Sequence, residues 1–152
     1  MKRSAALLVY KTAPDGIQVF LVHPGGPFWA RKDLGAWSIP KGEFDDSEDG
    51  PTAARREFFE EVGQRIEGNF IALTPVKQRG GKIVHAWAVE GDVNETAIRS
   101  NTFEMEWPPR SGRKTSFPEI DQGRWFTMQE ASRRILPSQL PILKQLLANL
   151  TK

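Results

Sequence analysis

Apolar residues occur along the chain in short runs, and their spacing first of all predicts strands. Residues 4–10 contain an almost continuous apolar run, and 17–22 form a second one after the turn signal Pro14-Asp15-Gly16. Both faces of 82–90 are largely apolar, which is typical of an interior strand. Further strands are expected at 36–39, which Pro40 ends, at 69–79, which precedes Gly80-Gly81, and at 123–126.

Helices are indicated by residues that favour their ends. A helix is predicted over 51–62, because proline suits its first turn and Gly63 suits its end. Thr127 is expected to cap a second helix of about two turns, and a third is predicted over 138–150. Strands and helices are interspersed without a repeat or a linker. Residues 1–152 are therefore predicted to form one domain of the α+β class, an α/β/α sandwich whose mixed sheet lies between helices.

One long segment does not follow either pattern. Residues 91–118 are polar and rich in proline, and no clear periodicity runs through them. A connection of this length without secondary structure is usually functional, so we expect it to contribute to a site.

The composition excludes several classes of protein. Of the 152 residues, 39% are hydrophobic and 26% are charged, as in ordinary soluble proteins. No run of about 18 apolar residues is present, so no membrane-spanning helix is predicted. The apolar stretch near the N-terminus is short for a signal peptide and suits a first strand better. Zero cysteines exclude disulfides, thiolate catalysis and Cys-ligated zinc, and fit a cytoplasmic protein.

The net charge is only +2, but the acidic residues are concentrated. Eight of the 19 acidic residues, and two of the 21 basic ones, fall between Glu43 and Glu61. An acidic patch in an otherwise basic chain suits a site for a metal ion and a polyphosphate. A solvent-facing acidic loop would have the same composition, and charge alone favours that interpretation.

Helical geometry changes this interpretation. At about 100° per residue, Glu57, Glu60 and Glu61 share one face of the predicted helix, and an apolar face containing Phe58 and Val62 lies beside it. Carboxylates one turn apart repel each other, so the arrangement is unfavourable without a counter-ion. Magnesium is a hard cation that is commonly held by a few carboxylates and substrate phosphates, and it would relieve this repulsion.

The spacing around the helix resembles the Nudix box, Gly-x5-Glu-x7-Arg-Glu-U-x-Glu-Glu-x-Gly-U, in which U is a bulky aliphatic residue. Phe58 and Gln64 depart from the pattern at its two aliphatic positions, where the side chains serve packing. Every fixed position is present: Gly42, Glu48, Arg56, Glu57, Glu60, Glu61 and Gly63.

The resemblance extends beyond the box. Residues 37–42 are similar to the strand and turn that precede the box in diadenosine-polyphosphate hydrolases. Residues 119–131 resemble the usual closing strand and helix of the family. Residues 23–27 and 103–109 resemble a bacterial group of small, MutT-like nucleoside-triphosphate pyrophosphohydrolases.

The resemblance implies a Nudix fold with 42–64 as its loop–helix–loop motif. It also implies metal-dependent hydrolysis of phosphoanhydride bonds in substrates that contain a nucleoside diphosphate, with Mg²⁺ or Mn²⁺ as cofactor. By position, Glu57, Glu60 and Glu61 would bind the metal near the Gly42 carbonyl, Arg56 would orient a glutamate, and Glu48 would brace the loop. The metal would neutralise the pyrophosphate and activate the attacking water.

Several residues outside the box are candidates for the remaining roles. Nudix enzymes often take their catalytic base from outside the box, and the sequence does not choose between Glu104, Glu106 and Glu119. Trp29 and Trp107 lie in Gly/Pro-rich segments, where they are candidates for stacking on a base. His85 is a packed strand residue or a site residue, depending on the face it occupies. Basic candidates for contacts with substrate phosphates are Lys41, Arg31, Lys32, Arg79 and Lys82.

The chain thus has three possible functions. The first is a pyrophosphohydrolase of nucleoside triphosphates or dinucleoside polyphosphates. The second is the same chemistry at the 5′ end of RNA, and the third is a non-catalytic, nucleotide-sensing Nudix module. Loss of a box carboxylate would favour the third, and none is lost. The oligomeric state is left open by the sequence.

Overall fold

The computed structural model describes residues 2–151, and the side chain of Arg79 lies outside what it describes. Its central element is β1 (Arg3–Ala13), which is buried from Ser4 to Tyr10. This strand pairs with three others, antiparallel with β2 (Gly16–Pro24) and β3 (Lys41–Phe44) and parallel with β6 (Ile83–Glu90). The almost continuous apolar run of residues 4–10 is thus explained, because β1 has neighbouring strands on both edges and a core on both faces.

The remaining strands complete a mixed sheet. β9 (Ile120–Thr127) pairs with the outer edge of β2. On the other side, β4 (Ile71–Ala72) and β5 (Val76–Lys77) both pair with β6. β6 therefore lies inside the sheet, as its two apolar faces predicted.

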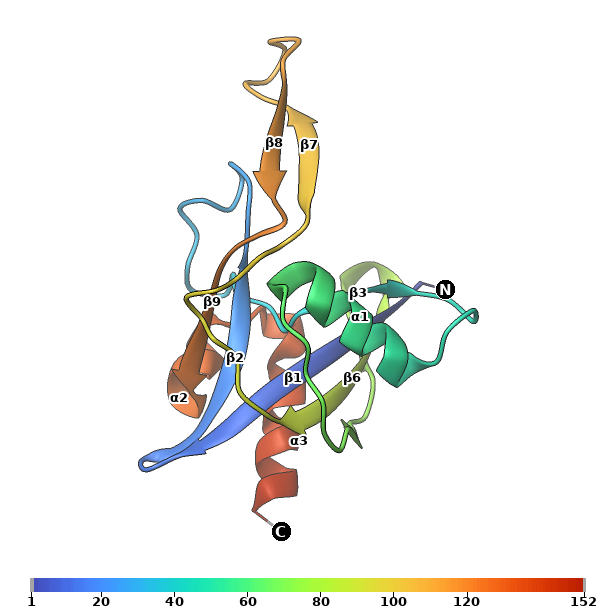
Figure 1. Cartoon of the computed structure of the whole chain (residues 1–152), viewed down its shortest axis with the longest axis vertical. Helices are drawn as coiled ribbons and strands as arrows, with labels where there is room; N and C mark the ends of the chain where they lie inside the picture. The colour runs from blue at the N-terminus through green and yellow to red at the C-terminus, as the bar shows by residue number, and fades with distance from the viewer. Residues whose placement is uncertain (1, 152) are drawn as a thin grey trace.

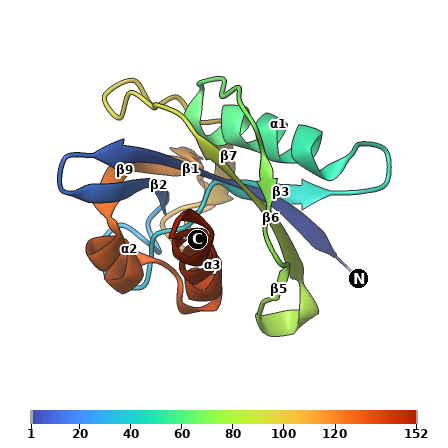
Figure 2. The same cartoon turned by 90° about the horizontal axis from the view of Figure 1, so that it is seen from below.

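Helices cover both faces of this sheet (Figures 1 and 2). One face carries α1 (Gly50–Val62), and the other carries α2 (Met128–Arg134) and α3 (Leu140–Leu150), which follows the short 3-10 turn η2 (Pro137–Gln139). The side chains of β1 alternate between two cores. Ala5, Leu7 and Val9 pack on the α1 side, and Ala6, Leu8 and Tyr10 on the other. The predicted α/β/α arrangement is confirmed.

The helix α1 forms as its end signals predicted. The carboxylate of Asp49 accepts a hydrogen bond from the Thr52 N–H at 2.7 Å, and Gly63 ends the helix in the left-handed conformation at φ 80°. Its buried side chains lie at helical spacing on one face: Ala53, Ala54, Phe58 and Val62. Burial of this face against the sheet determines which way the glutamates of the helix point.

β2 and β3 lie along the same edge of β1 at different positions, and the sheet opens between them. β2 pairs with Tyr10–Ala13 and β3 pairs with Arg3–Ala6. Between them, β2 leaves β1, and Val22 forms an isolated antiparallel bridge with Ser38 instead. The separation leaves the start of β3 accessible from this side of the sheet.

Three predicted segments differ from the structure. Residues 36–39 form only isolated bridges, at Trp37 and Ser38, in place of a strand. Residues 69–79 do not form one strand, because Pro75 has no N–H and the backbone of Thr74 bonds to the Gln145 side chain of α3. Only the two-residue strands β4 and β5 form there, followed by the 3-10 turn η1 (Arg79–Gly81).

The segment 91–118 is not a structureless loop. It contains a hairpin of β7 (Thr102–Glu106) and β8 (Lys114–Pro118), which projects from the body of the molecule (Figure 1). We call this hairpin the arm. No helix among residues 2–151 has the length and apolar character needed to cross a membrane.

Candidate active site

Arg56 connects the box glutamates on the solvent side of α1. Its guanidinium donates to Glu48 at 2.6 Å, to Glu57 at 2.9 Å and to Glu60 at 3.2 Å. These contacts, with that to Glu48 first, raise the pKa of Arg56 above its ordinary value. One permanent cation therefore holds three carboxylates that would otherwise repel each other, and it aligns the loop before α1 with the helix.

Glu57 and Glu61 face the start of β3 rather than solvent. The Glu57 carboxylate lies against Gly42, where any Cβ would overlap it. Glu61 accepts a hydrogen bond from the Lys41 N–H at 3.2 Å. Burial, with smaller contributions from the nearby charges of Glu57 and Glu119, raises the pKa of Glu61 to about 8, although the hydrogen bond from the Lys41 N–H acts in the opposite direction. Burial also raises the pKa of Glu57. Both groups are thus acids whose charged forms need a positive partner.

The carboxylates around Gly42 suit a divalent cation by their chemistry. Within residues 2–151, no three Asp, Glu or His side chains are arranged as a ready metal centre, and the guanidinium of Arg56 contacts both Glu57 and Glu60. The chemistry of the set nevertheless fits a hard cation, since the Glu57 carboxylate lies against Gly42, Glu61 lies at the neighbouring Lys41 N–H, and burial raises the pKa of both acids. Glu57, Glu60 and Glu61 are the residues that would hold such a cation.

The segment before β3 is fixed from the opposite side of the sheet. Gln139 is fully buried, its Oε1 accepts from the Ile39 N–H at 2.9 Å, and its Nε2 donates to Ser38 Oγ at 3.0 Å. This contact places Lys41 beside Glu61. Burial lowers the pKa of the Lys41 ammonium, and the neighbouring charge of Lys82 acts in the same direction. Lys41 is thus the basic candidate that the structure brings to the glutamates.

A series of backbone hydrogen bonds joins the root of the arm to α1. Asn101 N–H donates to the Glu60 carbonyl at 2.9 Å, and Glu119 N–H donates to the Asn101 carbonyl at 2.8 Å. Gly25 N–H in turn donates to the Glu119 carbonyl at 2.8 Å. Glu119 is therefore held between the loop after β2 and the helix. Its side chain lines the same two pockets as Glu61.

Glu104 and Glu106 are not brought to the site. Alternation along β7 turns Phe103 and Met105 toward the pocket that Glu61 lines, so the two glutamates project from the other face of the arm and are exposed. Glu106 accepts a hydrogen bond from the Arg110 N–H and closes the turn of the arm. Of the three candidates for a base outside the box, the geometry favours Glu119.

A pocket of about 570 Å³ opens between the loop 25–29 and the arm. Trp29 lines it, as does Phe28, whose side chain is 63% exposed. Trp107 does not line it but meets the Phe28 ring edge-on, with the ring centroids 5.7 Å apart. A smaller pocket of about 220 Å³ includes Trp29, Lys41, Glu61 and Glu119.

Three other basic candidates, Arg31, Lys32 and Lys82, have different surroundings, and the side chain of Arg79 lies outside the described part of the chain. Arg31 and Lys32 line a separate pocket of about 260 Å³ with Arg124 and Arg134. The ammonium of Lys82 forms an ion pair with Glu43 at 3.2 Å. His85 packs between the rings of Phe44 and Trp87.

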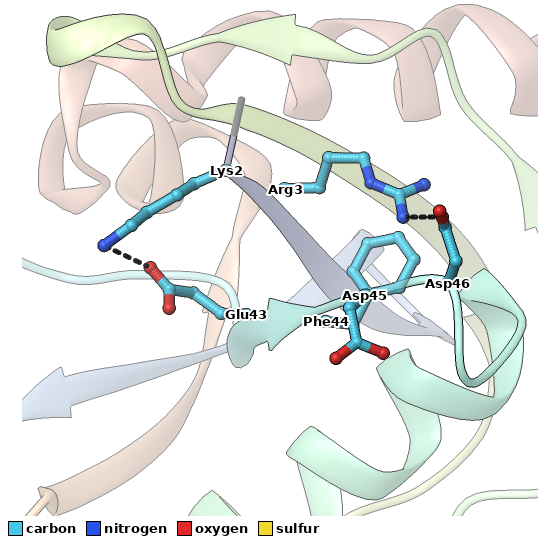
Figure 3. A pocket seen from close by; sticks show the side chains of 6 residues that line it. All are labelled: Lys2, Arg3, Glu43, Phe44, Asp45 and Asp46. Carbon is cyan, nitrogen blue, oxygen red and sulfur yellow. Dashed lines mark hydrogen bonds and ion pairs between the residues drawn. The ribbon is translucent and has the colours of Figure 1, made fainter.

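Another pocket, of about 400 Å³, lies where β1 begins and β3 ends (Figure 3). Its charges are paired across it, Lys2 with Glu43 at 3.8 Å and Arg3 with Asp46. None of the box glutamates on α1 lines it. We therefore place the chemistry at the pockets that contain Glu61.

The sequence interpretation missed Phe28, Phe103 and Met105 as residues of the site. A signal was available for Phe103 and Met105, because residues 102–106 alternate between polar and apolar residues and a Pro-containing turn follows them. The position of Phe28 depends on how the loop meets the arm, and the sequence carries no sign of that contact.

Comparisons with known proteins agree with this structure. The NUDIX domain model matches residues 1–147. The RNA pyrophosphohydrolase of Rhodospirillum rubrum is 28% identical over 165 residues, covering 97% of this chain and 90% of the relative.

Solved structures share the fold. An Ap4A hydrolase of C. elegans in a binary complex matches with a TM-score of 0.67 at 20% identity, covering 97% of this chain and 98% of that one. The NUDIX domain of Shewanella oneidensis NrtR, complexed with ADP ribose, matches with a TM-score of 0.66 at 13% identity, covering 97% and 87%. Because the family model spans nearly the whole chain, the resemblance drawn from the box is confirmed, and the chain belongs to the Nudix family of hydrolases.

Proposed function

We propose that this chain hydrolyses a phosphoanhydride bond in nucleoside triphosphates or dinucleoside polyphosphates. The observation that carries the proposal is the position of Glu61. Its partly buried carboxylate lines both the Lys41 pocket and the larger apolar pocket, and Glu119 lines both as well. A polyphosphate bound there would lie between a cation-binding carboxylate set and an ammonium group.

Each residue has a physical role in this proposal. Glu57, Glu60 and Glu61 would hold Mg²⁺ or Mn²⁺, which when bound neutralises phosphate charge and lowers the pKa of water. The Lys41 ammonium contacts a phosphate oxygen. Arg56 is a positioning residue, because its contacts fix Glu48, Glu57 and Glu60. Glu119, which is exposed at the pocket, accepts the proton of the attacking water.

Turnover of a substrate panel tests the proposal. The purified protein would be assayed with Mg²⁺, with Mn²⁺ and with EDTA, using ATP, GTP, diadenosine tetraphosphate and ADP-ribose. We expect metal-dependent hydrolysis of at least one polyphosphate, seen as release of phosphate or pyrophosphate from a nucleoside triphosphate or as formation of two mononucleotides from diadenosine tetraphosphate, and no hydrolysis in EDTA. Nucleotide binding without turnover under either metal would support the non-catalytic module instead.

A second candidate is removal of pyrophosphate from the 5′ end of RNA. Two observations favour it: the similarity to an RNA pyrophosphohydrolase over nearly the whole chain, and the pocket lined by Arg31, Lys32 and Arg124, which suits further backbone phosphates. Adding a 5′-triphosphorylated oligonucleotide to the panel separates the two. A much higher kcat/KM for the oligonucleotide than for free nucleotides would replace the first proposal with the second.

A further inference from the structure

The larger pocket has apolar walls contributed by two separate segments. The loop 25–29 supplies Phe28 and Trp29, and the arm supplies Phe103 and Met105. Its volume of about 570 Å³ lies within the range of small-molecule sites. Because Glu61 and Glu119 also line it, this pocket is continuous with the proposed site of hydrolysis.

Close packing fixes the two walls relative to one another. A Cβ on Gly26 would lie 3.0 Å from the Phe103 ring, and one on Gly25 would overlap the Pro118 carbonyl. The rings of Phe103 and Phe117 pack together within the arm, with their centroids 6.0 Å apart. Larger residues at either glycine would push the loop away from the arm and widen the pocket.

Phe28 is the exposed aromatic residue of this pocket. Its side chain is 63% exposed, and Trp107 meets it edge-on at an interplanar angle of 83°. An edge contact holds the ring in place and leaves its faces available for stacking. Lys32, which lies over the neighbouring Trp29 ring at 5.0 Å, adds positive charge beside the same wall.

We infer that this pocket binds the nucleobase of the substrate, with Phe28 stacking on the base and the arm holding Phe28 in place. The inference rests on the proposed function and names which part of the substrate the arm recognises. A base is planar and has apolar faces, so it matches the aromatic walls. A phosphate chain attached to it would extend toward Lys41 and Glu61, which line the adjoining pocket. A second protein chain or a lipid would place apolar groups against Glu61 and Glu119, where no charge would be compensated.

Binding of matched non-hydrolysable ligands tests the inference. Calorimetry with Mg²⁺ would compare the α,β-methylene analogues of ADP, GDP and UDP with methylenediphosphonate, which keeps the P–C–P group and lacks a base. We expect the wild type to bind at least one nucleotide analogue about tenfold or more tightly than methylenediphosphonate. Phe28→Ala should lose about five- to 100-fold in affinity for that analogue and should bind methylenediphosphonate unchanged.

Two further variants separate stacking from general damage. Phe28→Trp keeps an aromatic face and should restore most of the nucleotide affinity. Leu34→Ala is the matched control, because Leu34 is 61% exposed in the same connection and lies outside the pocket lining. Its affinities should match those of the wild type.

The outcomes distinguish this inference from the proposed function. Equal wild-type affinity for all four ligands, or an unchanged affinity of Phe28→Ala for the nucleotides, overturns the nucleobase pocket and leaves the phosphate site intact. If none of the four ligands binds, the nucleobase pocket is overturned, and the turnover panel decides the proposed function separately.

Discussion

The helix α1 and the arm meet where Asn101 N–H donates to the Glu60 carbonyl, yet they are held in opposite ways. One face of α1 is fully buried against the sheet, where Phe58 packs on Phe20. In the arm, no residue of β7 or β8 is buried, and one face is only half-covered. The box carboxylates proposed for metal binding thus lie on an element that the core fixes, whereas Phe103 and Met105, two of the residues proposed for recognition, lie on one that is held only at its root and by the loop 25–29. This division allows substrate preference to change without disturbing the carboxylates.

Glu61→Gln is expected to have the largest effect. The substitution keeps the shape of the side chain and removes the charge that would bind the cation. Losing several kcal/mol of transition-state stabilisation corresponds to a decrease in kcat of about a thousandfold or more. Steady-state turnover of the best substrate in the panel measures it, and circular dichroism should show an intact fold. Activity close to that of the wild type would remove the proposed metal role of Glu61.

Phe58→Ala and Phe103→Ala compare how firmly the two regions are held. Phe58 is fully buried, so its truncation leaves a cavity and should cost about 3–5 kcal/mol in the free energy of unfolding. Phe103 is half-covered and packs on Phe117 across the arm, so its loss should cost less than about 1 kcal/mol. Urea denaturation of both variants gives the two values. Similar losses of unfolding free energy in the two variants would show that the arm is held as firmly as α1.

Glu119→Gln and Glu104→Gln test which glutamate outside the box acts as the catalytic base. Both residues are exposed, but Glu119 lines the pockets of Glu61 and Glu104 points away from them. As a proton acceptor, Glu119 should account for about 100-fold in kcat, whereas Glu104→Gln should retain wild-type activity. Equal activity of the two variants would show that Glu119 is not the base and that another carboxylate accepts the proton.

The sequence determined the parts of the molecule that depend on local order. The spacing from Gly42 to Gly63 placed three glutamates on one face of α1, because helical periodicity follows directly from residue positions. The apolar runs likewise predicted β1, β2 and β6, since a strand buried on both faces needs apolar residues at every position.

Tertiary structure decided which distant segments meet. The position of Glu119 follows from backbone hydrogen bonds that join Gly25, Asn101 and Glu60, and backbone groups carry no signature in the sequence. The prediction of one strand over 69–79 was wrong because the Gln145 side chain bonds the backbone at Thr74. The arm was missed because each of its strands has only five residues, which is too short for a clear alternation of apolar and polar positions. The glutamate helix could therefore be predicted from the sequence. The pocket beside it could not, because it forms only where the loop 25–29 packs against the arm.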